Sequence, residues 1–288
     1  MKTIEIAGLG EIFSDYEVFI FDVWGTIYDG QTLLPETINI LERLRYENKT
    51  VIFLSNSPQI ASVVKKRLIS LGIPEYLLHK IITSGDEAKR RLAKKTYPEL
   101  KIFTGSVLLT GPNRYPNTIP QGLFTVTPNI KKANWIFNAG PDSPANTMED
   151  YYSLLKEAEK LELPMLCTNP DKTVFHGTET HICAGALANY FQLIGGNVHY
   201  IGKPFTDIFD RCKQIVNDDE DSKFLMIGDN LETDILGANN SNFDSLLLGS
   251  GVHQLSRLPG GPIDHRLIGT LQKKFNSKAT FVMGQLAW

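Results

Sequence analysis

Four polar side chains stand just after apolar segments of the sequence, where they could carry out chemistry: Asp22, Ser55, Lys203 and Asp229. The apolar run at residues 18–21 delivers Asp22 into a glycine turn, which suggests a covalent phosphoryl-transfer site. In that chemistry a carboxylate attacks phosphorus, and one difficult displacement becomes two easier ones. A phosphate dianion repels the attack, so a Mg²⁺ ion and a fixed cation must neutralise it. Asp22 and Asp229 offer the hard oxygen ligands that suit Mg²⁺.

The elements that must position these groups are short apolar strands that alternate with helices. The predicted strands of this kind cover residues 18–21, 51–54, 81–83, 198–201, 224–227 and 245–248. Apolar residues at helical spacing predict helices such as 35–47 and, near the end of the chain, 265–274. This alternation is typical of a parallel sheet covered on both faces. Ligands of such sheets bind beyond the carboxyl ends of the strands, where the four side chains stand.

The stretch of residues 85–184 is less regular and is interrupted by clusters of glycine, proline and asparagine. Its candidate elements are strands at 101–103, 135–138 and 165–168 and a helix at 148–161. We interpret it as a second α/β unit inserted into the first. The prediction is therefore a core domain of residues 1–84 plus 185–288 and a cap domain of residues 85–184. The last residues, 280–288, are expected along a sheet edge.

Four motifs occur in order along the chain: FDVWGT, FLSNS, IGKP and GDNLETD. This set and order resemble the haloacid dehalogenase (HAD) superfamily of phosphohydrolases. The insertion between the second and third motifs resembles the class II cap type. The segment CTNPDKTVFHGTETHICAGAL, followed by IGKP, resembles the NagD-like class IIA branch in particular. The resemblance covers most of the chain and implies a Rossmann-like parallel-sheet core with an inserted α/β cap.

The resemblance also implies a role for each polar group. Asp22 is expected to be the nucleophile, and Mg²⁺ is expected to bind Asp22, Asp229 and the backbone carbonyl of Trp24. A backbone ligand survives any change of side chain, so a metal site remains compatible with the tryptophan. Lys203 is expected to balance the charge of Asp22 and the phosphoryl oxygens. The Ser55 hydroxyl is expected to hydrogen-bond the phosphoryl group.

Residues beside these groups are candidates for supporting roles. Asp234 is expected to support the metal ligands rather than to bind the metal, and capping of the adjacent helix explains it equally well. Asn56 and Asp171 are expected to contact the substrate together with the serine and the lysine. For Asp171, which the resemblance places at the junction of cap and core, the alternative is a turn after proline. His176 and His181 fall near the substrate-contacting loop of the family, although a loop histidine more often has a solvated or structural role.

Trp24 stands two residues after the nucleophile, where most phosphatases of the superfamily carry an aspartate. That aspartate protonates the leaving alkoxide and later activates water, and an indole can do neither. General acid–base catalysis is typically worth about 10²–10⁴ in rate, so a slow or leaving-group-selective enzyme is expected. Asp29 is the nearest downstream carboxylate, but the Asp-Gly turn of a small hairpin explains it better.

Three interpretations of function remain open. The first is a Mg²⁺-dependent phosphomonoesterase that is slow or selective for good leaving groups. The second is a catalytically weak or inactive phosphoester-binding or regulatory protein that retains the fold. The third is displacement at carbon, in which a halide leaves without a proton. The pair Asp22 and Asp229 disfavours the third, because a monoanionic substrate attacked at carbon does not need Mg²⁺.

Composition narrows the range of partners. The chain has 288 residues and a formal net charge of −3, which argues against a general nucleic-acid binder. No run of eighteen apolar residues is present, so no membrane span is expected. The three cysteines are scattered, and the N-terminus does not resemble a signal peptide, so we expect a reduced, cytoplasmic protein. The expected partner is a small phosphorylated metabolite, and the class II cap leaves a homodimer open.

Overall fold

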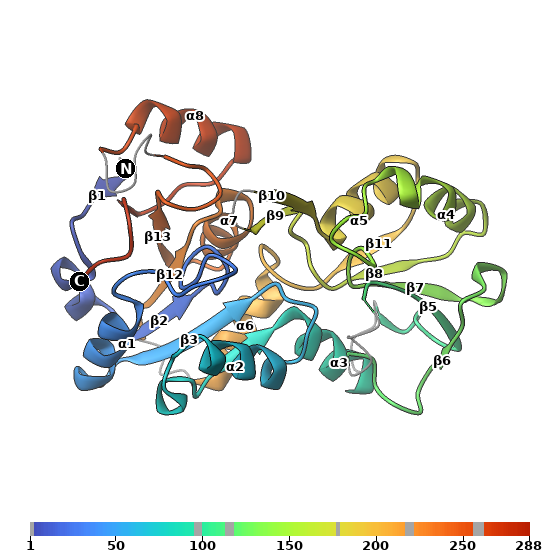
Figure 1. Ribbon diagram of the computed structural model, residues 1–288, viewed down its shortest axis with the longest axis horizontal. Coiled ribbons are helices and arrows are strands. Elements are labelled where there is room, and N and C mark those ends of the chain that lie inside the picture. The colour runs from blue at the N-terminus through green and yellow to red at the C-terminus, as the bar shows by residue number, and fades with distance from the viewer. Residues whose placement is uncertain (1–2, 95–99, 113–117, 177–178, 217–221, 256–261) are drawn as a thin grey trace.

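Two parallel sheets, with a short hairpin between them, organise the chain in the computed structural model (Figure 1). The structure describes residues 3–94, 100–112, 118–176, 179–216, 222–255 and 262–288. We call the part built on the seven-stranded sheet the core and the part built on the five-stranded sheet the cap. The described helices include none that is long and apolar enough to cross a bilayer.

The core sheet is parallel throughout and has the order β1-β14-β13-β12-β2-β3-β4. Its strands, in that order, are Ile4–Glu5, Phe281–Met283, Asp244–Leu248, Phe224–Gly228, Val18–Phe21, Thr50–Ser55 and Ile81–Thr83. In register, Phe21 of β2 lies opposite Ile227 of β12 on one side and opposite Phe53 of β3 on the other. The residues that follow these three strands therefore emerge at one edge of the sheet.

Helices cover both faces of the core sheet. They are α1 (Thr37–Tyr46), α2 (Ala61–Ser70), α6 (Thr206–Ile215), α7 (Leu236–Asn240) and α8 (His265–Phe275), with a π-helical turn η6 (Leu231–Ile235). Alternate residues of β2 supply the two apolar layers: Phe19 and Phe21 pack with α1 and α2, and Ile20 packs with α6. Burial on both faces is the physical reason for the uninterrupted apolar run of this strand. Short 3₁₀ turns complete the core at Leu9–Glu11, Phe13–Asp15 and Glu75–Leu77.

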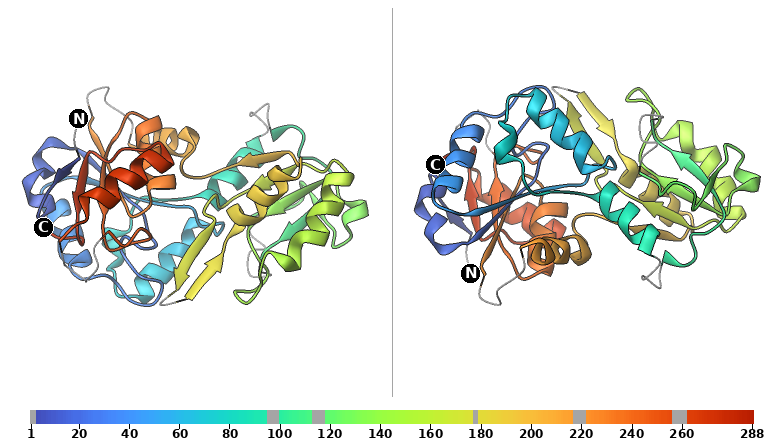
Figure 2. Two further views of the ribbon diagram at one scale, coloured as in Figure 1. Left: turned by 90° about the horizontal axis from the view of Figure 1, so that it is seen from above. Right: turned by 90° about the horizontal axis from the view of Figure 1, so that it is seen from below.

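The cap sheet is also parallel and has the order β11-β8-β7-β5-β6. Its strands, in that order, are Val198–Tyr200, Met165–Cys167, Trp135–Asn138, Ser106–Thr110 and Thr125–Val126. One face packs against α4 (Glu149–Lys160) and α5 (Ala184–Leu193), and the other packs against α3 (Ser84–Lys94). A 3₁₀ turn, η5, covers Ile130–Lys132. The antiparallel hairpin of β9 (Thr173–His176) and β10 (Glu179–Ile182) lies between cap and core (Figure 2).

The predicted end of the cap at residue 184 is wrong. Strand β11 pairs with β8 of the cap sheet, with Val198 opposite Met165, and α5 packs against α4. The cap therefore continues to about residue 201. A strand that follows a helix gives the same apolar pattern whichever parallel sheet it joins, so periodicity could not place β11.

Two smaller expectations also differ from the structure. Residues 101–103 form a turn rather than a strand, and the cap strand begins at Ser106. Strand β14 lies inside the core sheet between β1 and β13, and β1 forms the edge instead. A two-residue strand such as β1 is too short to leave a periodic signal.

Candidate active site

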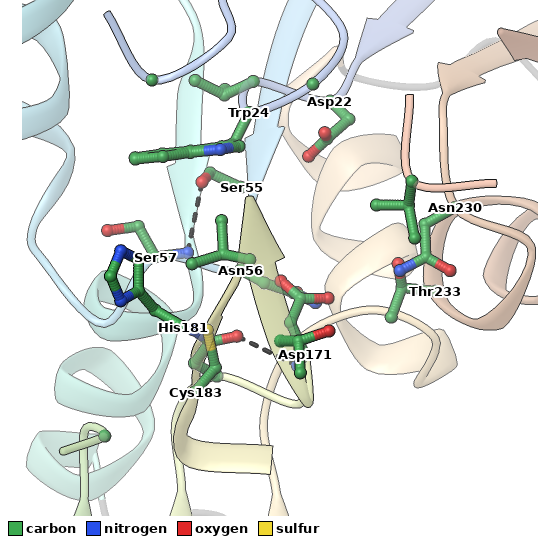
Figure 3. Close-up of a pocket in the computed structure, with 18 of the residues that line it drawn as sticks. Asp22, Trp24, Ser55, Asn56, Ser57, Asp171, His181, Cys183, Asn230 and Thr233 are labelled. Carbon is green, nitrogen blue, oxygen red and sulfur yellow. Dashed lines mark hydrogen bonds between the residues drawn. The ribbon is translucent and has the colours of Figure 1, made fainter. Parts of the chain in front are cut away.

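A cleft of about 950 Å³ between core and cap holds the predicted site residues (Figure 3). It lies at the carboxyl ends of β2, β3 and β12, as binding sites of parallel sheets do. Residues predicted from the sequence that line it are Asp22, Trp24, Ser55, Asn56, Asp171, His181, Lys203, Asp229 and Asp234. The structure thus brings together residues up to 212 positions apart in the chain, from Asp22 to Asp234.

Lys203 lies at the centre of the buried charges and is only 2% exposed. Its Nζ donates to Asp22 Oδ1 at 2.5 Å and to the carbonyl oxygen of Leu54 at 3.1 Å. It also lies 2.7 Å from Asp234 Oδ1. Burial by itself would lower the pKa of Lys203, but the surrounding carboxylates outweigh burial and raise the pKa above its ordinary value. The lysine is therefore a fixed cation, which a phosphoryl-transfer site needs beside its nucleophile.

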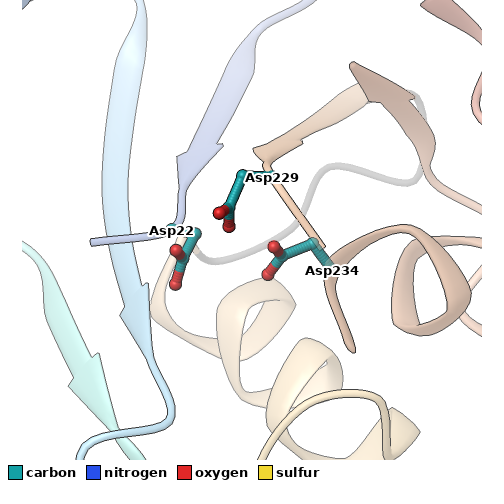
Figure 4. A group of neighbouring side chains, drawn as sticks. All are labelled: Asp22, Asp229 and Asp234. Carbon is teal, nitrogen blue, oxygen red and sulfur yellow. The ribbon is translucent and has the colours of Figure 1, made fainter. Parts of the chain in front are cut away.

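Asp22, Asp229 and Asp234 form a buried cluster whose carboxylate oxygens lie within 4.8 Å of one another (Figure 4). Burial raises the pKa of Asp22 to about 7, although the Lys203 ammonium opposes the rise. Burial, followed by repulsion from Asp22 and Asp234, raises the pKa of Asp229 well above its usual range. Three carboxylates thus share one ammonium, and all the donors are hard oxygens. This set fits Mg²⁺, because a divalent cation would offset the excess negative charge.

Asp234 has a larger part in this cluster than the sequence indicated. It contacts Lys203 directly and lies close enough to the other two carboxylates to be a candidate metal ligand. Its Oδ2 accepts a hydrogen bond from the backbone N–H of Asn230 at 3.1 Å. The alternative role as a helix cap belongs instead to Asn230, whose side chain accepts from the N–H of Glu232.

The loop after β13 is a part of the site that sequence reasoning missed. The N–H of Val252 donates to Asp229 Oδ2 at 2.8 Å, and a Cβ on Gly251 would lie 2.1 Å from Asp229 Cβ. Gly25 approaches from the other side, with φ of +86° and an ideal Cβ position 2.4 Å from Asp229 Oδ2. Only glycine fits such close approaches. The available signal was the sequence Gly249-Ser250-Gly251 directly after an apolar strand.

Asn56 joins three segments of the site through its side-chain amide. Its Oδ1 accepts from the backbone N–H of Lys203 at 2.7 Å, and its Nδ2 donates to the Lys203 carbonyl and to Asp171 Oδ1, both at 3.1 Å. The side chain is 3% exposed. Its amide thus positions Lys203 and Asp171, and the contact of Asn56 with substrate stays a prediction.

Ser55 and Asp171 face the cleft from opposite sides. The Ser55 hydroxyl accepts from the N–H of Ser57 at 3.2 Å, which leaves its proton available to a phosphoryl oxygen. Asp171 lies at the cap–core junction, and its N–H donates to Asn169 Oδ1 at 3.0 Å, so the alternative of a turn also holds. Burial raises the pKa of Asp171 to about 6, against the opposing effect of Lys203.

Trp24 and its neighbours form the outer wall of the cleft beside the nucleophile. The Trp24 side chain is half-buried, and its carbonyl as a metal ligand stays a prediction. Asp29 accepts backbone hydrogen bonds from Gln31 and Thr32, both at 2.8 Å, which confirms its role in a turn. His181 lines the cleft with its Nδ1 3.0 Å from the carbonyl oxygen of Pro144. The side chain of His176 lies outside the described part of the chain.

Two family models match the chain: haloacid dehalogenase-like hydrolase over residues 19–115, and a second HAD-hydrolase-like model over residues 200–270. Phosphoglycolate phosphatase 2 of Arabidopsis thaliana is 27% identical over 86% of this chain and 87% of its own. The 4-nitrophenylphosphatase of Schizosaccharomyces pombe is 26% identical over 84% of this chain and 86% of its own. The crystal structure of a haloacid dehalogenase-like hydrolase from Brucella suis has a TM-score of 0.81 at 27% identity and covers 98% of this chain and 100% of that one.

The chain belongs to the haloacid dehalogenase superfamily, in its class IIA branch. The family and the Rossmann-like parallel fold inferred from the four motifs are therefore confirmed. As a HAD hydrolase, the protein keeps an aspartate at the end of the first motif strand and the lysine that contacts it. Two residues after Asp22 the chain carries Trp24, whose indole cannot act as a general acid or base.

Proposed function

We propose that this HAD hydrolase is a Mg²⁺-dependent phosphomonoesterase that acts through an aspartyl phosphate on Asp22. The observation that carries the proposal is the contact of Lys203 Nζ with Asp22, inside a cluster of three buried carboxylates. A buried nucleophilic carboxylate beside a fixed cation and a metal-binding oxygen set is the arrangement that attack on a phosphate dianion requires. The phosphatase names of the curated relatives support the same reaction class.

In the first step, a carboxylate oxygen of Asp22 forms a bond to phosphorus while the bond from phosphorus to the ester oxygen breaks. The ester oxygen leaves with the bonding electron pair. Lys203 and the Ser55 hydroxyl lie beside Asp22 in the cleft, where they stabilise the charge of the phosphoryl oxygens. When bound, Mg²⁺ would be held by Asp22, Asp229 and the Trp24 carbonyl, with Asp234 adjacent, and would neutralise phosphoryl charge.

Trp24 limits both halves of the reaction. Its indole cannot donate a proton to the departing oxygen, so the leaving group must depart as a stable anion. Water that attacks the aspartyl phosphate in the second step also lacks the usual base. Since general acid–base catalysis is worth about 10²–10⁴ in rate, turnover is slow or selective for good leaving groups.

The same substitution favours one second candidate function. A protein that keeps the charged site but lacks the acid can bind a phosphoester without cleaving it at a useful rate. In that case the chain would be a weak or inactive binding or regulatory protein of the HAD fold. Formation of an aspartyl phosphate separates the two candidates, because a pure binder forms none.

The proposed partner is a small phosphorylated metabolite, since the cleft is lined by both charged and apolar groups. The net charge of −3 argues against nucleic-acid binding. We also propose that the protein is cytoplasmic and has no membrane partner. The class II cap is compatible with a homodimer. The three free, buried cysteines support a reducing compartment.

A screen of phosphate monoesters with and without Mg²⁺ tests the proposal, with Asp22→Asn as the blank. We expect turnover that requires Mg²⁺ and disappears in the blank. Trapping the wild-type protein with beryllium fluoride or aluminium fluoride tests the nucleophile independently. Turnover without added metal, or full activity of Asp22→Asn, would contradict the proposal.

A further inference from the structure

The side chain of Trp24 lies on the side of the cleft where a leaving group must lie. In-line attack by Asp22 places the leaving group on the far side of phosphorus from the nucleophile. That direction leads outward from the sheet edge toward the cap. Figure 3 shows the Trp24 indole extending from the backbone beside Asp22, past Ser55, toward the side of the cleft where His181 of the cap lies. The indole is therefore a wall of the leaving-group side of the cleft.

The indole is held in place by its own hairpin. The Tyr28 ring packs against it at a centroid distance of 5.0 Å and an interplanar angle of 59°. The N–H of Gly25 donates to the Tyr28 carbonyl at 2.8 Å. Gly30 lies so close that a Cβ there would be 2.6 Å from Trp24 Cζ2. Arg67 of α2 donates to the Gly30 carbonyl at 3.2 Å and so ties the hairpin to the core. Because the indole is already ordered, little conformational entropy is lost when a ligand packs against it.

Apolar side chains line the cleft together with polar ones. The apolar lining residues include Leu34, Val63, Pro141, Pro144, Val174 and Ile182, and the polar ones outside the charged cluster include Gln59, Arg67 and Glu179. Apolar and ring surfaces suit a flat, weakly polar leaving group. They suit a sugar poorly, because each buried hydroxyl would need a hydrogen-bonding partner.

We propose that Trp24 determines specificity by stacking on the leaving group, so that the substrate class is the phosphate monoesters of flat aromatic or heteroaromatic alcohols. This inference rests on the proposed phosphomonoesterase function and adds a binding role for the indole to its lack of acid chemistry. The two roles are compatible, since aromatic hydroxylates depart without a proton more easily than alkoxides do. Stacking is a ground-state contact, so it acts on substrate affinity rather than on the chemical step.

The test compares 2-naphthyl phosphate with phenyl phosphate, whose leaving groups have similar basicity but different ring areas. In the wild type we expect KM to be roughly two- to tenfold lower for the naphthyl ester, the range of one aromatic contact, with similar kcat. Trp24→Leu removes this difference, and Trp24→Phe retains part of it. Binding of 2-naphthylmethylphosphonate, measured by calorimetry with Mg²⁺ present, weakens in the same order. An unchanged KM ratio and unchanged phosphonate affinity in Trp24→Leu would overturn the inference.

Gly30→Ala tests the same wall without altering Trp24. The new Cβ displaces the indole, so the preference for the naphthyl ester falls. Gly72→Ala is the matched control. Gly72 has a similar backbone conformation, with φ of +107° against +98° for Gly30, but a Cβ at Gly72 would meet no neighbouring atom. A loss of preference in Gly30→Ala and not in Gly72→Ala supports the inference, and equal behaviour of the two variants contradicts it.

The calorimetric arm separates this inference from the proposed function. If the wild type binds the phosphonate in a Trp24-dependent manner but hydrolyses no ester, the proposed function fails and the stacking wall stands. If the wild type hydrolyses both esters with the same KM and Trp24→Leu does too, the function stands and the stacking wall fails.

Discussion

The two sides of the cleft are built on different physical principles. On the phosphate side, Lys203 contacts both Asp22 and Asp234, and all three side chains are buried. On the side that we assign to the leaving group, Trp24 and His181 are half-buried, and the Trp24 indole packs against the ring of Tyr28. A change on the first side leaves an uncompensated buried charge, whereas a change on the second alters shape and apolar area. The phosphate side should therefore control rate and stability, and the leaving-group side should control choice of substrate.

The largest expected effect is the dependence of the rate on the leaving group, and it tests the contrast between the two sides of the cleft. Aryl phosphates should be cleaved about 10²–10⁴ times faster than alkyl or sugar phosphates of similar size, because Trp24 cannot protonate the departing oxygen. Steady-state rates of the wild-type protein measure this ratio, and a burst followed by slow turnover is expected as well. Equal rates on both ester types would mean that another residue supplies the proton.

Loss of the buried cation should cost more stability than any surface change. Lys203→Met leaves Asp22 and Asp234 buried without their partner, and a broken buried ion pair typically costs about 3–5 kcal/mol. Chemical denaturation measures the free energy of unfolding. Lys213→Met, at a more exposed lysine of α6, serves as the control and should be nearly neutral. Similar losses in the two variants would contradict the claim that the buried charges of the phosphate side control stability.

Metal affinity provides a third test, confined to the phosphate side. Asp229→Ala should weaken Mg²⁺ binding by at least about 100-fold. Loss of a residue that only hydrogen-bonds a metal ligand costs at most about that much, and loss of a ligand should cost more. The fold should persist, since the substitution removes one carboxylate from a cluster with excess negative charge. Calorimetric titration gives the affinity, and circular dichroism checks the fold. Wild-type affinity in this variant would exclude Asp229 as a ligand.

The smallest effect on stability is expected for the exposed ion pair between Lys172 and Glu232, which joins the cap–core junction to the core. Lys172 Nζ lies 2.6 Å from Glu232 Oε2, but the two side chains are 54% and 35% exposed. Exposed ion pairs contribute about 0.2–1 kcal/mol, so Lys172→Ala should change the free energy of unfolding only slightly. A double-mutant cycle with Glu232→Ala isolates the coupling energy. A coupling above about 2 kcal/mol would show that this pair fastens the cap to the core.

The sequence predicted which residues meet in the cleft better than it predicted the boundary between cap and core. Asp22 and Asp229 each follow a strand of the core sheet, and the carboxyl ends of parallel strands meet by geometry, so their convergence in the cleft was accessible to sequence reasoning. Lys203 follows β11 of the cap sheet, so its place beside Asp22 was expected from the family resemblance and not from the geometry of one sheet. The resemblance carried by the four motifs led to the correct family and fold class. Asp29 was also correctly assigned to a turn, because an Asp-Gly pair is a local signal.

Sequence alone determined which residue types stand at the strand ends and that a tryptophan stands two residues after Asp22, since both are local properties of the chain. Tertiary structure alone decided that β11 joins the cap sheet, because hydrogen-bonding partners of a strand leave no mark in its own apolar pattern. It also decided that Asp234 shares Lys203 with Asp22, and that Gly251 lies against Asp229. These contacts depend on the spatial path of distant segments, and the energy of a buried charge depends on all its neighbours at once.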